Sequence, residues 1–163
     1  MATAENPTRS SRVPVLDVLG CVLALVAGGL LTRPNLGWYA SLNKPGFEPP
    51  NRTFTIVWPI LSAVMAVSAW LAWKAPGTDE DRKLAFIWFF IQLALGVLWS
   101  YAFLLAAHPA FGLAVIMALL IAIVITIVMF DRLSRVAALL LIPLALWVCY
   151  ATALNFAFFM FNG

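Results

Sequence analysis

Long apolar runs separated by short polar segments dominate this chain. Runs of about 20 apolar residues are long enough to cross the roughly 30 Å hydrocarbon core of a bilayer as helices. A spanning β-barrel would need alternating polar and apolar residues instead of continuous runs. The pattern therefore predicts an all-α protein, an integral membrane five-helix transmembrane bundle formed by one domain (15–163), with spans at roughly Val15–Thr32, Phe54–Trp73, Leu84–Ala107, Phe111–Phe130 and Val136–Phe161.

The polar segments between these runs differ in length and character. Residues 1–14 are polar, and we expect a disordered tail here. A signal peptide is disfavoured, because the following run is too long for an h-region. Segment 33–53 is far longer than a connector needs, and it contains the stretch WYASLNKPGFEPP (38–50). Its prolines, Pro45, Pro49 and Pro50, fix φ, so we expect this loop to hold a defined shape.

Composition and charge support a membrane location. The chain is 64% hydrophobic and 10% charged, whereas soluble domains contain about 25% charged residues. The net charge of +3 gives no dense basic face, so nucleic acid is not an expected partner. Basic residues favour the N-terminal side by seven to three, with Arg33, Lys44 and Arg52 on the other side. The positive-inside rule then predicts a cytoplasmic N-terminus.

Residues suited to acid–base or metal chemistry are scarce. The single histidine, His108, precedes Pro109 in a short turn, where we expect it to be solvated. Cys21 and Cys149 fall in apolar runs, and we expect reduced core residues. Asp17 is the only acid inside a predicted span, and it lies near the end. The sequence therefore predicts no metal site, and it gives little support to a proton pump, which needs buried acids.

Tryptophan is abundant, with seven in 163 residues. Trp70, Trp73 and Trp88 lie near span ends, as expected of an interfacial aromatic belt. Trp58, Trp99 and Trp147 instead recur at helical spacing with small or polar residues. They form three stripes: Trp58, Ser62 and Met65; Gln92, Gly96, Trp99 and Phe103; Trp147, Ala151 and Asn155. Amides are costly in lipid, so these stripes are expected to face inward. Spacing alone leaves core packing and a ligand cavity both open.

A second kind of stripe lies in the first span. Gly20, Ala24 and Gly28 recur every four residues. Small residues at this spacing allow another helix to approach closely. The approaching helix could belong to the same bundle or to a second copy, as a homodimer seam.

Four sequence blocks together resemble the translocator protein (TSPO) family, also called tryptophan-rich sensory proteins. The blocks are WYASLNKPGFEPP, FTIVW (54–58), QLALGVLWS (92–100) and PLALWVCYATALNF (143–156). The resemblance implies a five-helix bundle, commonly a homodimer, in a bacterial cell membrane. It also implies porphyrin or haem as a ligand, with no cofactor required, in a cavity that the first loop covers as a lid.

Transferred by position, the family's ligand site would be built from the lid and three helices. The implied residues are Trp38, Tyr39, Phe54, Trp58, Ser62, Gly96, Trp99, Ser100, Phe103, Trp147, Ala151, Leu154 and Asn155. Lys44, Pro45, Pro49 and Pro50 would form the lid. Porphyrin propionates could meet Lys44, Arg33 or Arg52.

The chain departs from the family pattern at three positions. Ser62 and Leu144 replace tyrosines, and Gly96 replaces an asparagine. We therefore expect a roomier and less polar cavity that binds the family's benzodiazepine-type drugs poorly. The C-terminal segment NFAFFMFNG also lacks the tyrosine and basic residue of the proposed sterol motif.

Three functions stay open at this stage. The first is transport, sequestration or sensing of tetrapyrroles such as protoporphyrin IX and haem. The second, suggested by some relatives, is light- and oxygen-dependent porphyrin degradation with Trp58 and Trp147 as candidate redox residues. The third is regulation through a partner protein that binds the Gly20–Gly28 stripe.

Overall fold

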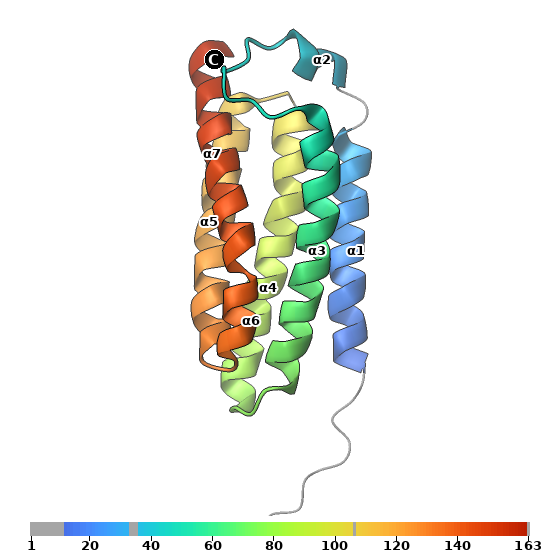
Figure 1. Cartoon of the computed structure of the whole chain (residues 1–163), viewed down its shortest axis with the longest axis vertical. Helices are drawn as coiled ribbons and strands as arrows, with labels where there is room; N and C mark the ends of the chain where they lie inside the picture. The colour runs from blue at the N-terminus through green and yellow to red at the C-terminus, as the bar shows by residue number, and fades with distance from the viewer. Residues whose placement is uncertain (1–11, 33–35, 106, 163) are drawn as a thin grey trace, which may run out of the picture.

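The computed structural model describes residues 12–32, 36–105 and 107–162 (Figure 1). Most of the predicted tail, and Arg33 in the loop, lie outside the described residues. The secondary-structure elements of the described residues are all helices. They are α1 (Arg12–Thr32), α2 (Leu36–Ser41), α3 (Asn51–Lys74), α4 (Asp79–Trp99), the π-helix η2 (Ser100–Leu105), α5 (Pro109–Asp131), α6 (Arg135–Leu140) and α7 (Ile142–Asn162).

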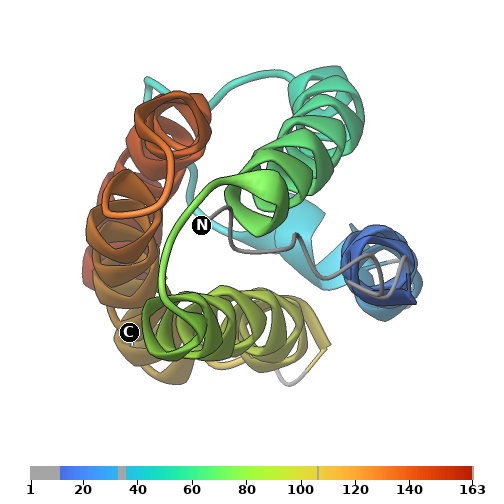
Figure 2. The ribbon, with the colours of Figure 1, turned by 90° about the horizontal axis from the view of Figure 1, so that it is seen from below.

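The long helices stand side by side as a membrane bundle. Viewed along the bundle, α1 is followed around the ring by α3, by α6 with α7, by α5 and by α4 (Figure 2). In the described chain, helical stretches long and apolar enough to cross a membrane are Arg52–Lys74, Asp79–Phe103, Pro109–Asp131 and Arg135–Asn162. Helix α1 adds a shorter apolar stretch, Val18–Leu30. The predicted fold class is therefore confirmed.

Helix α4 begins earlier than its apolar run suggested. Thr78 caps it, because its hydroxyl accepts a hydrogen bond from the Asp81 backbone N–H at 3.1 Å. Acidic residues Asp79 and Asp81 in the first turn also favour the positive end of the helix dipole. The polar residues from Asp79 onward therefore belong to the helix, and the connection after α3 shrinks to residues 75–78.

The last predicted span is two helices instead of one. Helix α6 ends at Leu140 and α7 begins at Ile142. Pro143 explains the break, because proline has no N–H to donate to the carbonyl of Leu139, and its ring clashes with that turn. At the junction, the Leu141 N–H bonds to the Ala138 carbonyl at 3.1 Å. The two helices still follow one another along the same side of the bundle (Figure 1).

The end of the bundle opposite α2 is tightly closed. The buried Arg82 guanidinium donates to the carbonyls of Ala72, Trp73 and Ala75, which satisfies the C-terminal end of α3. The Ser68 hydroxyl donates to the Ala137 carbonyl at 2.7 Å and so joins α3 to α6. These contacts tie α3 to α4 and to α6 at this end of the bundle.

The small-residue stripe of α1 packs inside the bundle. A Cβ added to Gly20 would lie 3.3 Å from the Phe90 ring of α4, and one added to Gly28 would lie 3.2 Å from the Ser100 hydroxyl of η2. The close partner is therefore within the same chain. The structure thus supports the intrachain alternative for Gly20 and Gly28, and the homodimer seam stays a prediction.

The two cysteines lie in different environments. Cys21 is buried, as expected, whereas Cys149 is exposed on the outside of α7. The prediction of a core position is wrong for Cys149, because α7 turns Val148 inward and the next residue away from the bundle. Neither cysteine is in a disulfide.

Candidate functional site

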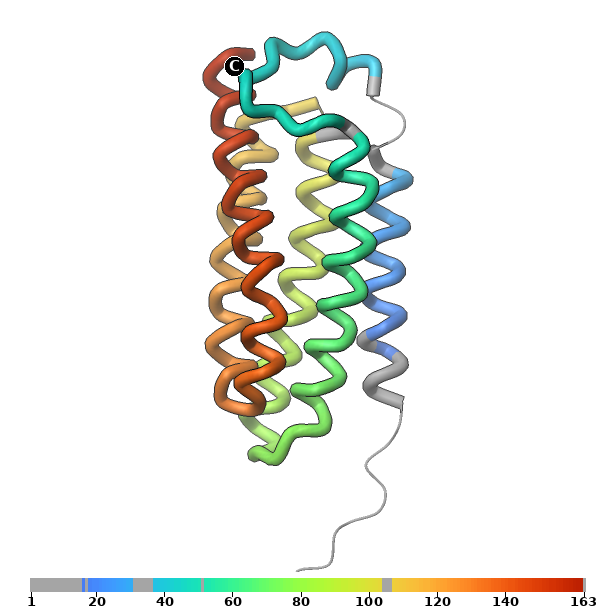
Figure 3. Tube along the Cα trace, in the orientation of Figure 1, coloured from blue at the N-terminus to red at the C-terminus, as the bar shows by residue number. Residues whose placement is uncertain are grey.

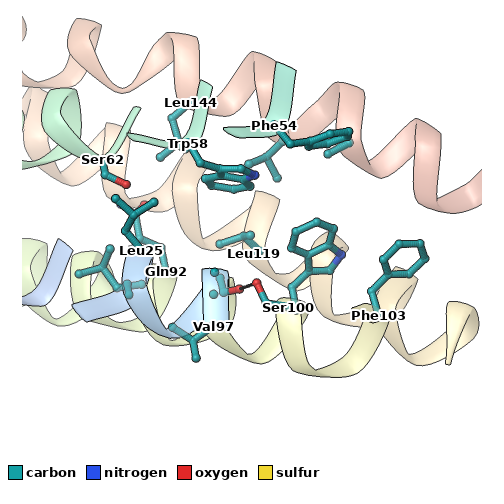
Figure 4. A pocket seen from close by; sticks show the side chains of 18 of the residues that line it. Leu25, Phe54, Trp58, Ser62, Gln92, Val97, Ser100, Phe103, Leu119 and Leu144 are labelled. Atoms are coloured by element: carbon teal, nitrogen blue, oxygen red, sulfur yellow. Dashed lines mark hydrogen bonds between the residues drawn. The ribbon is translucent and has the colours of Figure 1, made fainter. Parts of the chain in front are cut away.

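An elongated cavity of about 600 Å³ lies inside the bundle beneath α2. Residues of α1, α3, α4, η2, α5 and α7 line it, together with Tyr39 of α2. Figure 4 shows Ser62 and Gln92 at one end of this cavity and Phe103 at the other, with Trp58 between them. Phe54 and Ser62 are eight residues apart on α3, which corresponds to about 12 Å along a helix.

Aromatic rings form one wall of the cavity. The Trp58 and Trp99 ring centroids lie 6.2 Å apart, with planes tilted by 34°. Phe103 stacks on Trp99 at 5.9 Å and 5°. Trp99 and Phe103 are one helical turn apart at the α4–η2 junction, so the wider π-turn carries both rings on the same side. This wall presents flat, apolar faces to a guest.

A hydrogen bond fixes the orientation of Trp99. Its indole N–H donates to Asn155 Oδ1 at 3.2 Å, and Asn155 Nδ2 donates to the Ala151 carbonyl at 3.0 Å. Asn155 is 2% exposed. The interaction joins α4 to α7 across the cavity and satisfies polar atoms that would otherwise be costly to bury.

The segment from α2 to α3 crosses the open end of the bundle (Figure 3). Its residues 42–50 are attached to α7 at two places. Asn162 accepts from the Asn43 backbone N–H at 2.8 Å and donates to the Asn43 carbonyl at 3.1 Å. The Tyr150 hydroxyl donates to the Phe47 carbonyl at 2.7 Å. This segment is a cover held in place by hydrogen bonds.

A small polar cluster holds the cover together. The Tyr39 hydroxyl donates to Glu48 Oε1 at 2.7 Å, and Lys44 Nζ lies 3.1 Å from the same oxygen. Lys44 also lies 4.7 Å from the centre of the Tyr39 ring. Burial raises the pKa of Tyr39 well above its ordinary value, and the Glu48 carboxylate adds to this effect. Tyr39 is therefore a neutral hydrogen-bond donor at physiological pH.

Most of the expected site residues do meet around this one cavity. The lining includes Tyr39, Phe54, Trp58, Ser62, Gly96, Trp99, Ser100, Phe103, Ala151, Leu154 and Asn155. Lys44, Pro45, Pro49 and Pro50 do not border it and belong to the cover. His108 is exposed and does not line the cavity.

Two expected wall residues lie outside the lining. Trp38 packs its ring edge-on against Phe103 at 5.9 Å, and Trp147 packs edge-on against Phe54 at 5.6 Å. Both stand in a second layer behind the cavity wall. The placement of Trp147 in the wall is wrong because residues spaced by four turn about 40° at each step, which leaves Trp147 at the edge of its stripe.

Sequence patterns missed several lining residues. The inward face of α7 also includes Val148 and Phe158, both buried. Helix α5 contributes Leu119 and Ile123. These aliphatic residues carry no signal that separates a cavity wall from ordinary packing. The small residues of α1 could have been recognised, because Ala24 and Gly28 were already expected to face a neighbouring helix.

The three departures from the family pattern all border the cavity. Ser62, Gly96 and Leu144 are lining residues. A Cβ added to Gly96 would have no heavy atom within 4 Å, apart from its own helix and neighbours. The space beside Gly96 is therefore open enough to accept a side chain.

Comparison with known proteins agrees with this architecture. The model of the TspO/MBR family matches residues 18–160. The chain is 37% identical over 154 residues to the tryptophan-rich protein TspO of Archaeoglobus fulgidus, covering 91% of this chain and 99% of that protein.

Similarity extends to bacterial and mammalian proteins. The chain is 33% identical over 141 residues to the tryptophan-rich sensory protein of Cereibacter sphaeroides, covering 86% of each. It is 30% identical over 149 residues to the translocator protein of Sus scrofa, covering 88% of each. These matches span nearly all of the helical bundle described above. The chain is therefore a multi-pass membrane protein that belongs to the TspO/MBR family.

Proposed function

We propose that this protein binds a planar tetrapyrrole, such as protoporphyrin IX or haem, in the cavity beneath α2, and so carries, sequesters or senses it in the membrane. The observation that carries the proposal is the aromatic wall of Trp58, Trp99 and Phe103 around about 600 Å³ of space. Small-molecule sites commonly occupy about 300–1,000 Å³ and are mostly apolar. Aromatic faces suit a flat apolar guest because offset stacking is favourable.

The carboxylates of such a guest need a cation near the open end. Lys44 is already paired with Glu48 at 3.1 Å. Arg52 is exposed at the start of α3, and no described carboxylate lies within salt-bridge distance of it. Arg52 shares a helix face with Thr55, which lines the cavity. In this proposal Arg52 is the described cation best placed to meet a propionate.

Titration of the detergent-purified protein with protoporphyrin IX tests the proposal. Bound porphyrin should quench tryptophan fluorescence, and Trp58→Ala should weaken binding about tenfold or more, because an apolar contact worth about 1.5 kcal/mol is lost. Trp147→Ala is the matched control, since Trp147 stands behind the wall. Equal affinities for the wild type and Trp58→Ala would reject the proposed site.

A second candidate is light-dependent porphyrin oxidation, and the closeness of Trp58 and Trp99 at 6.2 Å favours it. Trp58 lines the cavity, so it is the better redox partner of the two tryptophans considered earlier. Illuminating the aerobic complex should then yield a protein-dependent product. The yield should fall in Trp58→Phe and persist in Trp147→Phe. A product yield independent of both tryptophans and of the protein would exclude this activity.

A further inference from the structure

The side chain of Gln92 is buried at the end of the cavity farthest from α2. It is 2% exposed and lines the cavity from α4. Its Nε2 lies 3.9 Å from the Met65 sulfur, and its Oε1 has no hydrogen-bond partner among the described residues. A carboxamide offers two donor hydrogens and two acceptor lone pairs, whereas a thioether is a weak acceptor. Gln92 therefore has unused hydrogen-bonding capacity in an apolar place.

Turning the carboxamide over does not solve this problem. A reversed amide would place its oxygen beside the Met65 sulfur, so that two acceptors would face each other. Its nitrogen would then take the position where Oε1 now has no described partner. In either orientation one end of the amide stays unsatisfied by protein. Native structures usually avoid this, so such a group calls for a partner.

The surroundings of Gln92 provide room and a second polar group. Ser62 lines the same end of the cavity, as Figure 4 shows. No described residue hydrogen-bonds to its hydroxyl. Gly96, one turn from Gln92, leaves open space, because an added Cβ there would meet nothing within 4 Å. A ligand group could reach both polar side chains without displacing protein atoms.

The other buried polar side chains of the cavity are already engaged. Asn155 bonds to Trp99 and to the Ala151 carbonyl. The Ser100 hydroxyl donates to the Gly96 carbonyl at 3.3 Å. Among these cavity residues, unused hydrogen-bonding capacity is therefore concentrated at Gln92 and Ser62, about 12 Å or more below the cover.

We propose that Gln92, assisted by Ser62, is a recognition site for a hydrogen-bond donor, a hydroxyl or an N–H, on the leading end of a planar apolar guest. This inference rests on the proposed binding cavity and narrows the ligand class. A guest with only alkyl groups at that end would separate the Gln92 oxygen from any water and leave it unsatisfied. A guest with a donor there would replace that water, so the cavity distinguishes the two.

A matched pair of probes tests the inference: 1-pyrenemethanol and 1-methylpyrene, which differ by one hydroxyl. Binding is followed by energy transfer from tryptophan to pyrene in the detergent-solubilised full chain, and each probe's partition into empty micelles is subtracted. The wild type should bind 1-pyrenemethanol about tenfold more tightly, the effect of one hydrogen bond. Gln92→Met, which keeps the side-chain volume, should abolish the preference. Thr152→Val is the matched control and should retain the preference, because Thr152 does not line the cavity and its hydroxyl donates to the Val148 carbonyl of its own helix at 2.8 Å.

The possible outcomes are distinct. Equal affinity of the wild type for both probes overturns the inference, and this comparison needs no variant to fold. A preference that persists in Gln92→Met overturns the assignment to Gln92. Absence of saturable energy transfer from either probe overturns the proposed binding cavity itself. Preference in the wild type, lost in Gln92→Met and kept in Thr152→Val, supports the inference.

Discussion

The contact between α5 and η2 gives a sharp test of how the aromatic wall is held. A Cβ added at Gly112 would lie 2.8 Å from Phe103 Cβ and 3.2 Å from its Cα. Those atoms are close to the backbone and cannot rotate away. At Gly96, by contrast, an added Cβ would meet nothing within 4 Å. Gly112→Ala and Gly96→Ala therefore make the same chemical change in a tight place and an open one.

The expected difference follows from two terms. Replacing glycine by alanine in a helix stabilises by up to about 1 kcal/mol, and this gain applies to both variants. Only Gly112→Ala adds overpacking, which costs about 1–3 kcal/mol. The overpacking term alone should thus separate the variants. For a chain of this size, 1 kcal/mol corresponds to a melting-temperature shift of about 2–4 °C, so Gly112→Ala should melt about 2–12 °C below Gly96→Ala.

Thermal unfolding in one detergent, followed by circular dichroism, measures this difference. A Gly112→Ala variant that melts at or above Gly96→Ala would refute the close packing of α5 on Phe103. Porphyrin titration of the same samples adds a functional check. Gly112→Ala should bind protoporphyrin IX more weakly, because a displaced Phe103 disturbs its stack on Trp99.

Three further predictions concern the cavity and its cover. Gly96→Asn should strengthen binding of a benzodiazepine-type ligand, because it restores a polar group where space exists. Tight binding by the wild type that the substitution leaves unchanged would count against this prediction. Asn162→Ala removes both hydrogen bonds to the Asn43 backbone and should speed porphyrin release about fivefold in stopped-flow measurements. Asn43→Ala is the control: it keeps the backbone groups that Asn162 contacts and should leave the release rate unchanged. Because burial raises the folded-state pKa of Tyr39 above its unfolded value of about 10, its contribution to stability is complete below pH 10 and is lost as pH rises. Urea titrations should show this added alkaline slope, about 1.4 kcal/mol per pH unit, in the wild type and not in Tyr39→Phe; equal slopes would refute it.

The bundle was predictable from sequence because membrane spans depend on length and hydropathy alone. Boundaries that depend on local hydrogen bonds were less accurate. Thr78 and Asp81 form a helix cap, yet their polarity resembles a loop when only hydropathy is considered. Pro143 breaks the final span at Leu141, and an apolar run conceals such a break.

The site was predictable where polar or small residues marked an inward face. Gln92 and Asn155 line the cavity, because an amide is costly in lipid and so turns that face of its helix inward. Trp58, which recurs with Ser62 on one face of α3, lines the cavity as well. Trp147 was misplaced because a tryptophan at a stripe edge can pack behind the wall as well as within it. The α1 stripe shows the same limit: spacing predicts close approach of a helix and cannot tell which chain supplies it.

A structure of the protein bound to protoporphyrin IX tests the central claim most directly. We predict that the macrocycle lies against Trp58 and the Trp99–Phe103 stack, beneath residues 42–50, with its propionates toward Arg52. A macrocycle bound on the outer surface of the bundle, with the cavity holding no part of it, would contradict the account.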